Sequence, residues 1–232
     1  LNLKLAVDTN VENMVTRATA DEETLPDIND FSIAVLQNNN VQLTWNRYAD
    51  FTDGTEIAAG NYTLKATYGN IETQGFEAPY YEGAKEFSIK KNESTNISVI
   101  CYLANVKVTT EYTELFKKYF TDYTVNIRPA GSTDISFDKN ETRAAYVKPG
   151  KISIYLSGSK QQGNKVTFEA ATIENAKARQ HYRLKFDVQA GGTELDVSFT
   201  DETERVPITI DISDDALNTQ PPFFTPTGFE SG

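Results

Sequence analysis

Apolar and polar residues alternate with a period of two along most of this chain. Leucine or valine occupies positions 1, 3, 5 and 7, and the same alternation recurs in residues 62–68, 123–127, 182–188 and 206–212. Successive side chains of a β-strand point to opposite faces, so this pattern is typical of strands with one buried and one solvated face. Turn-forming residues separate the runs. The sequence therefore predicts an all-β fold, either a sandwich or a barrel.

The alternating runs give the expected element boundaries. A short helix is predicted near residues 113–120, because Leu115, Phe116, Tyr119 and Phe120 recur at helical spacing. Residues 170–180 fit either a helical turn or a connection between strands. Strands are expected at residues 1–8, 30–36, 41–46, 61–68, 86–91, 96–101, 104–111, 122–128, 151–157, 181–189, 194–200 and 205–212.

Four sequence blocks recur in the same order, which indicates an internal duplication. The paired blocks are residues 1–8 with 104–111, 30–35 with 122–127, 58–66 with 148–156, and 86–99 with 185–198. We expect two tandem domains, an N-terminal sandwich over 1–101 and a C-terminal sandwich over 102–213. Gly60 and Gly150 should then open equivalent strands. A Pro-rich tail, 214–232, is expected to dock or to lead into a further domain.

Charge and composition exclude several classes of function. The chain has 22 Lys and Arg against 33 Asp and Glu, a net charge of −11. Nucleic acids and anionic membranes need clustered cations, so neither is an expected partner. His181 and Cys101 are the only residues of their types. Because one histidine and one cysteine leave little for a metal centre or a nucleophile–histidine pair, we predict no catalytic residue, no metal, no cofactor and no enzymatic activity.

Each of these two single residues also has a structural interpretation. Cys101 follows the apolar residues Val99 and Ile100, where a thiol is typically a small buried hydrophobe. His181 precedes an alternating run and is interpreted as a polar residue at the edge of a strand. Acidic stretches at 21–30, 50–56 and 211–215 lack the spacing of a calcium-binding loop and are interpreted as solvated loops.

Two segments resemble a known family. Residues 57–69, IAAGNYTLKATYG, resemble the glycine-led strand of transthyretin-like sandwiches in surface lipoproteins of Bacteroidetes. Residues 97–127, ISVICYLANVKVTTEYTELFKKYFTDYTVNI, are similar to the middle of a family of such lipoproteins of unknown function. More distantly, the two-domain plan resembles fimbrillins and fimbrial tip or anchor proteins. The resemblance implies two transthyretin-like or Ig-like sandwiches, export, and a place at the cell surface or outer membrane, with any lipid anchor outside this chain.

The fimbrillin resemblance also implies a candidate processing site. In fimbrillins, cleavage after an arginine removes the first strand, and a neighbouring subunit fills the groove by β-strand addition. Here Arg17 follows the predicted strand 1–8. A single arginine in a loop is also common in any chain, so an intact adhesin, anchor or cap protein is the preferred form.

The predicted function is non-enzymatic adhesion or fimbria-like assembly, with protein subunits or host surface ligands as partners. The alternative is a glycan-binding surface lipoprotein of a polysaccharide-uptake system. Phe76, Tyr80 and Tyr81 are the candidate ligand-contact aromatics, because Gly75 and Pro79 interrupt regular structure around them. We expect the rings of Tyr80 and Tyr81 to face solvent.

Overall fold

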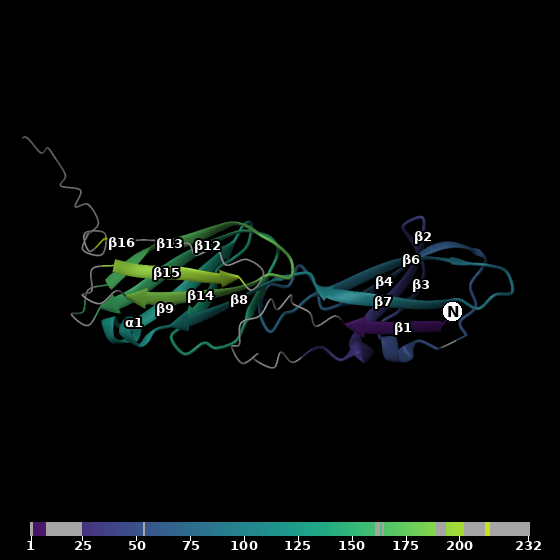
Figure 1. The fold of residues 1–232 in the computed structure, drawn as a ribbon, viewed down its shortest axis with the longest axis horizontal. Helices are drawn as coiled ribbons and strands as arrows, with labels where there is room; N and C mark the ends of the chain where they lie inside the picture. The colour runs from purple at the N-terminus through teal and green to yellow at the C-terminus, as the bar shows by residue number, and fades with distance from the viewer. Residues whose placement is uncertain are drawn as a thin grey trace, which may run out of the picture.

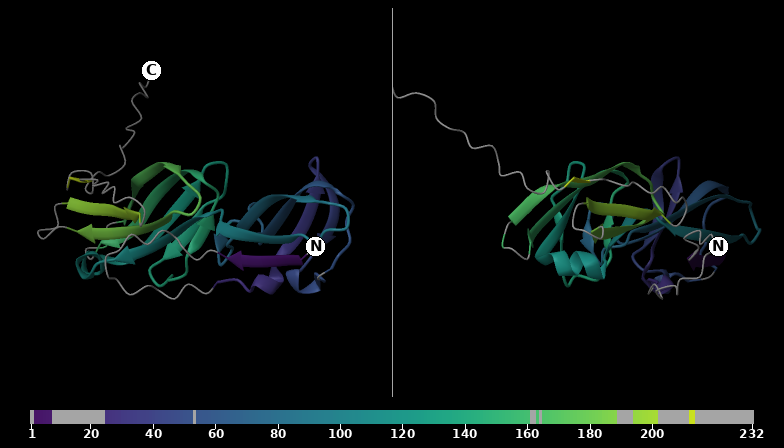
Figure 2. Two further views of the ribbon diagram at one scale, coloured as in Figure 1. Left: turned by 45° about the vertical axis from the view of Figure 1, so that its right-hand side comes forward. Right: turned by 60° about the vertical axis from the view of Figure 1, so that its left-hand side comes forward.

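The chain folds into two β lobes that lie end to end along the longest axis of the molecule (Figure 1). The computed structural model describes residues 2–7, 25–52, 54–160, 163, 165–188, 194–201 and 212–213. The further views of Figure 2 show the same arrangement of the lobes. The predicted all-β sandwich class, with one short helix in the second half of the chain, is confirmed.

The first lobe contains one sheet with the strand order β1-β7-β6-β4-β2-β3. Strand β6 pairs with β4 along its whole length, but with β7 only through Tyr81–Leu103 and Glu82–Tyr102. The sheet therefore divides into two layers beyond these two pairs, and the core lies between them. The elements of this part of the chain, residues 2–103, are the strands β1 (Asn2–Val7), β2 (Ser32–Gln37), β3 (Asn40–Trp45), β4 (Gly60–Tyr68), β5 (Gly75–Phe76), β6 (Tyr81–Ile89) and β7 (Asn96–Leu103), and the short 3-10 helices η1 (Ile28–Asp30) and η2 (Tyr48–Asp50). Of these strands, β5 belongs to a sheet of the second lobe.

The second lobe is a sandwich of two sheets. One has the order β10-β9-β12-β13, and the other β16-β15-β14-β8-β11-β5. Its elements are β8 (Val106–Tyr112), α1 (Glu114–Tyr119), β9 (Phe120–Pro129), β10 (Ile135–Asp138), β11 (Ala145–Val147), β12 (Gly150–Lys160), β13 (Lys165–Ala176), β14 (His181–Val188), β15 (Glu194–Asp201) and β16 (Ile212–Ser213).

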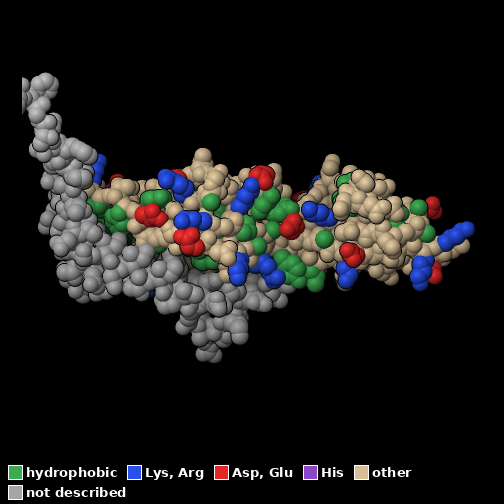
Figure 3. Space-filling model, turned by 90° about the horizontal axis from the view of Figure 1, so that it is seen from above, with side chains coloured by type: hydrophobic (Ala, Val, Ile, Leu, Met, Phe, Trp, Pro, Cys, Tyr) green, Lys and Arg blue, Asp and Glu red, His purple; other side chains and the backbone are tan. Residues whose placement is uncertain are grey.

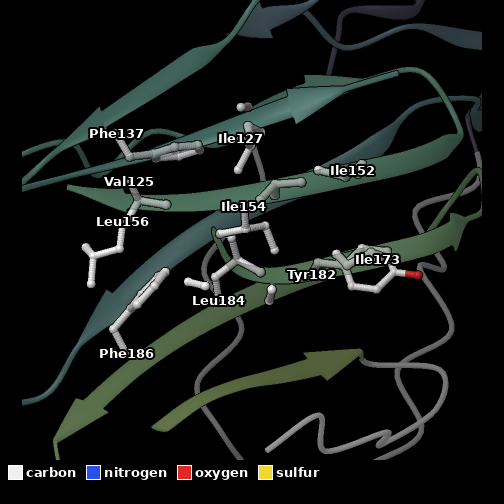
Figure 4. Packing of buried hydrophobic residues seen from close by; sticks show 14 of the residues in the cluster. Val125, Ile127, Phe137, Ile152, Ile154, Leu156, Ile173, Tyr182, Leu184 and Phe186 are labelled. Carbon is white, nitrogen blue, oxygen red and sulfur yellow. The ribbon is translucent and has the colours of Figure 1, made fainter. Parts of the chain in front are cut away.

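The core of the second lobe is made by alternate residues from the two facing sheets (Figure 4). Val125 and Ile127 of β9 lie across the interior from Leu184 and Phe186 of β14, and all four are fully buried. The intervening residues of these strands are more exposed, as alternation predicts. The apolar runs in the sequence therefore became the inner faces of the sandwich.

Helix α1 connects the two sheets of the second lobe. The Oγ1 of Thr113 accepts a hydrogen bond from the backbone N–H of Phe116 at 3.2 Å, which caps the first turn. The same hydroxyl donates to Asp187 on β14 at 2.6 Å. Phe116 is fully buried, whereas Leu115 is 48% exposed. The helix is thus held by one buried ring and its cap.

The two lobes share a strand plan, and its most distinctive element is a parallel pair. Strand β1 pairs in parallel with β7, and β8 pairs in parallel with β14. In the other layer, β2 pairs with β3 and β4 as β9 pairs with β10 and β12. The expectation for the glycines is confirmed, because Gly60 opens β4 and Gly150 opens β12.

The fourth predicted match of the repeat, residues 86–99 with 185–198, is wrong. Residues 86–99 span the end of β6 and part of β7, whereas 185–198 span parts of β14 and β15. The topology instead makes β13 and β14 the counterparts of β6 and β7. Alternating strands match one another at any even offset, so alternation alone could not fix this register.

Several strands were not predicted. Residues 165–176 form one long strand, β13, so neither a helical turn nor a connection describes 170–176. Only residues 177–180 are a connection, between β13 and β14. The short strands β5, β10 and β11 have two to four residues each, too few for alternation to be read from sequence. Of the predicted strand 205–212, only Ile212 falls within the described residues.

Candidate functional site

The part of the chain that the structure describes contains no cluster of side chains suited to a metal centre. No group of three or more His, Cys, Asp or Glu side chains lies close enough there to hold a metal ion. None of the described helices is long and apolar enough to cross a membrane.

His181 is buried, 7% exposed, at the start of β14. Its interpretation as a residue at a strand edge is corrected here, because β14 lies between β8 and β15 in the interior of its sheet. Its Nε2 lies 2.9 Å from the Oγ1 of Thr109 on β8. Burial, together with the positive charges of Lys107 and Arg183, lowers the pKa of His181 from 6.5 to about 3. The imidazole is therefore neutral and structural.

This environment predicts a pH-dependent contribution to stability. The unfolded chain takes up a proton at His181 below pH 6.5, whereas the folded chain does not until about pH 3. The stabilisation is therefore complete above pH 6.5 and falls by about 1.4 kcal/mol per pH unit as the pH drops below it. His181→Gln should remove this component. In urea titrations at pH 7, 6, 5 and 4, the difference in free energy of unfolding between the wild type and His181→Gln should therefore shrink as the pH falls. Parallel pH profiles would contradict the prediction.

Cys101 is fully buried in the core of the first lobe, which confirms its interpretation as a small hydrophobe. Burial, with a smaller effect of the Glu82 charge, raises the pKa of the thiol to about 12. The thiol is therefore protonated and unreactive in the folded chain. In the register of the first sheet, Cys101 is the partner of Val7 on β1.

The three candidate ligand-contact aromatics lie in different environments. Tyr81 is only 4% exposed, so the prediction that its ring faces solvent is wrong. It is the first residue of β6, where its ring packs near Phe31 at a centroid distance of 6.4 Å. Phe76 is partly buried and meets Phe137 of the second lobe edge to face at 5.0 Å. Tyr80 alone of the three lines a depression in the surface.

The segment that carries Phe76 joins the two lobes. Strand β5 extends the sheet of the second lobe by pairing with β11, where Phe76 is the partner of Ala145. The guanidinium of Arg143 lies over the Phe76 ring at 4.9 Å and forms an ion pair with Glu77 at 3.1 Å. Gln74 donates a hydrogen bond to the hydroxyl of Ser132 at 2.6 Å. The loop between β4 and β6 is therefore bound to the neighbouring lobe along its length.

The junction is reciprocal, because the second lobe also contributes to the first. Tyr146 of β11 is 9% exposed and belongs to the core of the first lobe. The side-chain carbonyl of Asn105, which is fully buried, accepts a hydrogen bond from the backbone N–H of Tyr80. The backbone N–H of Ala104 donates to the Tyr80 carbonyl at 2.8 Å. Tyr80 is thus fixed by the short connection between the lobes.

The N-terminal strand β1 is an edge strand. It pairs only with β7 among the described strands, over six residue pairs from Asn2–Asn96 to Val7–Cys101. Figure 1 shows β1 lying along β7 with both arrows directed toward the second lobe. The candidate processing residue Arg17 lies outside the described residues, as does the tail 214–232.

Charged side chains of both signs are interspersed on the described surface seen in Figure 3. Exposed ion pairs include Arg47–Asp30 at 2.7 Å and Arg128–Asp134 at 2.6 Å. Such pairs add at most about 1 kcal/mol each to stability. The described part of this face therefore carries no large field of one sign that could attract a polyanion.

Residues 1–214 match the family described as "Domain of unknown function (DUF4493)". The chain belongs to this family. A comparison with curated protein sequences gave no match.

Two solved structures are similar to this DUF4493 chain in fold. A fimbrial assembly protein from Parabacteroides distasonis is 11% identical, with a TM-score of 0.55, over 79% of this chain and 91% of that one. A candidate cell adhesion protein from Bacteroides uniformis is 13% identical, with a TM-score of 0.51, over 78% and 93% of the two chains. The predicted resemblance to Bacteroidetes surface proteins of this architecture is therefore confirmed at the level of the family and the fold.

Sequence reasoning missed the residues that build the junction and the depression beside Tyr80. Asn105 and Tyr146 gave no signal, because a buried asparagine and a tyrosine in a short strand have no characteristic spacing. For the depression, the available signal was the row of two small residues, Ser32 and Ala34, that alternates with the apolar residues Ile33 and Val35. That row could indicate an open face, but it could not indicate which loop borders it.

Proposed function

We propose that this chain is a non-enzymatic cell-surface protein that acts in adhesion or fimbria-like assembly. Two considerations support the proposal: the family resemblance of its sequence, and the likeness of its fold to a fimbrial assembly protein and a candidate adhesion protein. Export to the cell surface, a lipid anchor outside this chain, and domain bounds at 1–101 and 102–213 belong to the same proposal.

The observation that carries the proposal is the position of β1. It is the first described strand of the chain, lies at an edge of its sheet, and pairs with one strand among those that the structure describes. The equivalent strand of the second lobe, β8, is instead enclosed between β14 and β11. An edge strand of this kind can leave without dividing the remaining sheet, whereas β8 cannot.

Loss of β1 would be costly for an isolated chain. Positions 3, 5 and 7 are register partners of Ile97, Val99 and Cys101, which are all buried. Removal of β1 would uncover one side of these residues, and full burial of such an aliphatic side chain is worth about 1.5–3 kcal/mol. The vacated edge would also present unpaired backbone groups. A strand from a neighbouring subunit would satisfy both needs, which is the logic of assembly by strand addition.

The test is limited digestion of the full chain with an arginine-specific protease, followed by mass analysis and sizing. Cleavage at Arg17 and release of the strand under mild denaturant should yield elongated oligomers. A synthetic peptide with the sequence of residues 1–7 should suppress them. Cys101 supplies an independent readout, since its thiol is buried in the intact chain and should react with a thiol reagent once β1 has left.

Arg17→Gln is the matched control, because it removes the cleavage site and leaves β1 unchanged. Resistance at Arg17, or a cleaved protein that stays monomeric with an unreactive Cys101, would overturn assembly by strand removal. The intact adhesin, anchor or cap protein would then remain. Adherence of cells that display the chain, compared with cells that do not, tests that form.

The positions of the candidate aromatics weaken the glycan-uptake alternative. Of its three aromatic contacts, Tyr81 is buried in the first core and Phe76 packs at the junction. An aromatic platform must be reachable by the sugar, so these two rings cannot provide one together with Tyr80. Polysaccharide uptake therefore stays the second candidate function.

A further inference from the structure

A depression of about 340 Å³ lies on the outward face of the first lobe. Its lining includes Ser32 of β2, Thr44 of β3, Lys65 and Thr67 of β4, Asn70, and Tyr80. A volume near 300 Å³ is the lower end of the range for small-molecule sites, and it suits one or two sugar rings.

Strand register explains why these side chains share one face. Ser32 is the register partner of Thr67, and Ala34 is the partner of both Lys65 and Thr44. The neighbouring residues Ile33 and Leu64 point to the opposite side and are buried in the core. Ala34 lies between Thr44 and Lys65, and its short side chain forms the floor of the depression. The longer side chains of its neighbours form the rim.

The border formed by residues 69–80 is held in place by several contacts. Asn70 accepts a hydrogen bond from the backbone N–H of Glu72 through its Oδ1 at 2.9 Å. Tyr80 is fixed through its backbone to Asn105 and Ala104 of the connection between the lobes. The Tyr80 hydroxyl donates to Glu82 at 3.0 Å. The depression is therefore built largely in advance of any ligand.

The chemistry of the lining selects one class of ligand. Hydroxyls are supplied by Ser32 and Thr67, whose oxygens lie 2.7 Å apart, and by Thr44. None of the ion pairs among the described residues includes Lys65, so its ammonium group can donate to a ligand. Tyr80 adds an aromatic ring with an apolar body and a polar edge. A sugar ring presents hydroxyls on its rim and C–H groups on its faces, and it matches this set.

Other classes fit less well. A fatty acyl chain would remove water from the Lys65 ammonium group without offering it a hydrogen-bond acceptor, which is costly. A strongly acidic ligand would meet the carboxylate of Glu82, which lies in register with Thr67 on the same face. Fewer than three acidic or metal-binding side chains gather anywhere in the described part, so a cation is not favoured.

We propose that this depression binds a neutral hexose unit of a surface glycan, with Tyr80 as the stacking ring and Lys65, Asn70 and the three hydroxyls as polar contacts. The inference rests on the adhesive part of the proposed function and names its ligand class. It does not depend on removal of β1, because the depression lies on β2, β3 and β4.

The test uses the intact chain and saturation-transfer NMR with the methyl glycosides of glucose, galactose, mannose and N-acetylglucosamine at millimolar concentration. We expect saturation transfer to at least one glycoside, with amide shift changes confined to the lining residues. Lys65→Ala and Tyr80→Ala should each weaken the affinity about tenfold, the loss of roughly one good polar or stacking contact. Tyr80→Phe keeps the ring and should retain binding.

Lys165→Ala is the matched control, because Lys165 is an exposed lysine at the start of β13 in the other lobe. It should leave the affinity unchanged. If Tyr80→Ala does not fold, Lys65→Ala and Thr44→Val carry the comparison. Absence of transfer to every glycoside, or equal affinity in Lys65→Ala and the wild type, would overturn the inference. Neither result bears on assembly through β1, which is measured by sizing after digestion.

Discussion

Replacing Phe186 with alanine should lower the free energy of unfolding by about 3–5 kcal/mol, the range for a fully buried phenylalanine. Phe186 has no exposed surface and packs against Tyr112 at 5.5 Å and Phe116 at 5.8 Å between ring centroids. These contacts join β14, β8 and α1. The cavity left by the ring would therefore weaken both the sandwich and the attachment of the helix.

The measurement is urea unfolding followed by two signals. Circular dichroism reports strands in both lobes, whereas fluorescence of Trp45, the single tryptophan, reports the first lobe. Because Tyr146 and Phe76 connect the cores, we expect the Trp45 transition to shift together with the circular dichroism transition. Leu115→Ala is the control, since Leu115 is 48% exposed on α1 and should change stability by no more than about 0.5 kcal/mol. Equal shifts for the two variants would contradict the assignment of Phe186 to the core.

Gly69→Ala should destabilise the chain by at least about 2 kcal/mol more than Gly131→Ala, the cost of overpacking against backbone. Both glycines have a positive φ, +77° and +74°, so both substitutions carry the same strain from a left-handed backbone. A Cβ at Gly69 would lie 2.2 Å from the carbonyl oxygen of Pro79, whereas a Cβ at Gly131 would meet nothing within 4 Å. The difference between the two variants therefore isolates the backbone contact between Gly69 and Pro79.

This contact joins the two ends of the loop 69–80, which carries β5. Gly69→Ala should accordingly loosen the junction as well as the loop. Urea unfolding gives the stability, and hydrogen exchange of the Ala104 amide, which donates to Tyr80, gives the state of the junction. Similar stability losses in the two glycine variants would show that the backbone around Gly69 and Pro79 can move apart without cost, and would refute the prediction.

Local patterns in the sequence were sufficient for most strands and for the helix. The predicted run 61–68 became β4, the predicted run 96–101 lies within β7, and the predicted helix 113–120 contains α1. These predictions succeeded because alternation and helical spacing are properties of a few neighbouring residues. The strand β13 was missed because buried and exposed positions do not alternate regularly along it.

The same patterns failed for the candidate site. Tyr81 and Tyr80 are adjacent in sequence, yet one ring is in the core and the other borders a depression. The two rings differ because β6 begins at Tyr81, whereas the backbone of Tyr80 is hydrogen-bonded to residues 104 and 105. Neither feature has a signature in the residues around position 80.

The sequence by itself determined the all-β class and three of the four blocks of the shared strand plan, because these follow from side-chain period and order. Tertiary structure alone decided that β1 pairs in parallel with β7 at an edge, that β5 joins the sheet of the other lobe, and that Lys65 and Tyr80 line one depression. Each of these depends on contacts between residues far apart in the chain. Which strands pair and where a loop docks depend on burial and hydrogen bonding summed over the whole fold. A short stretch of sequence cannot predict that sum.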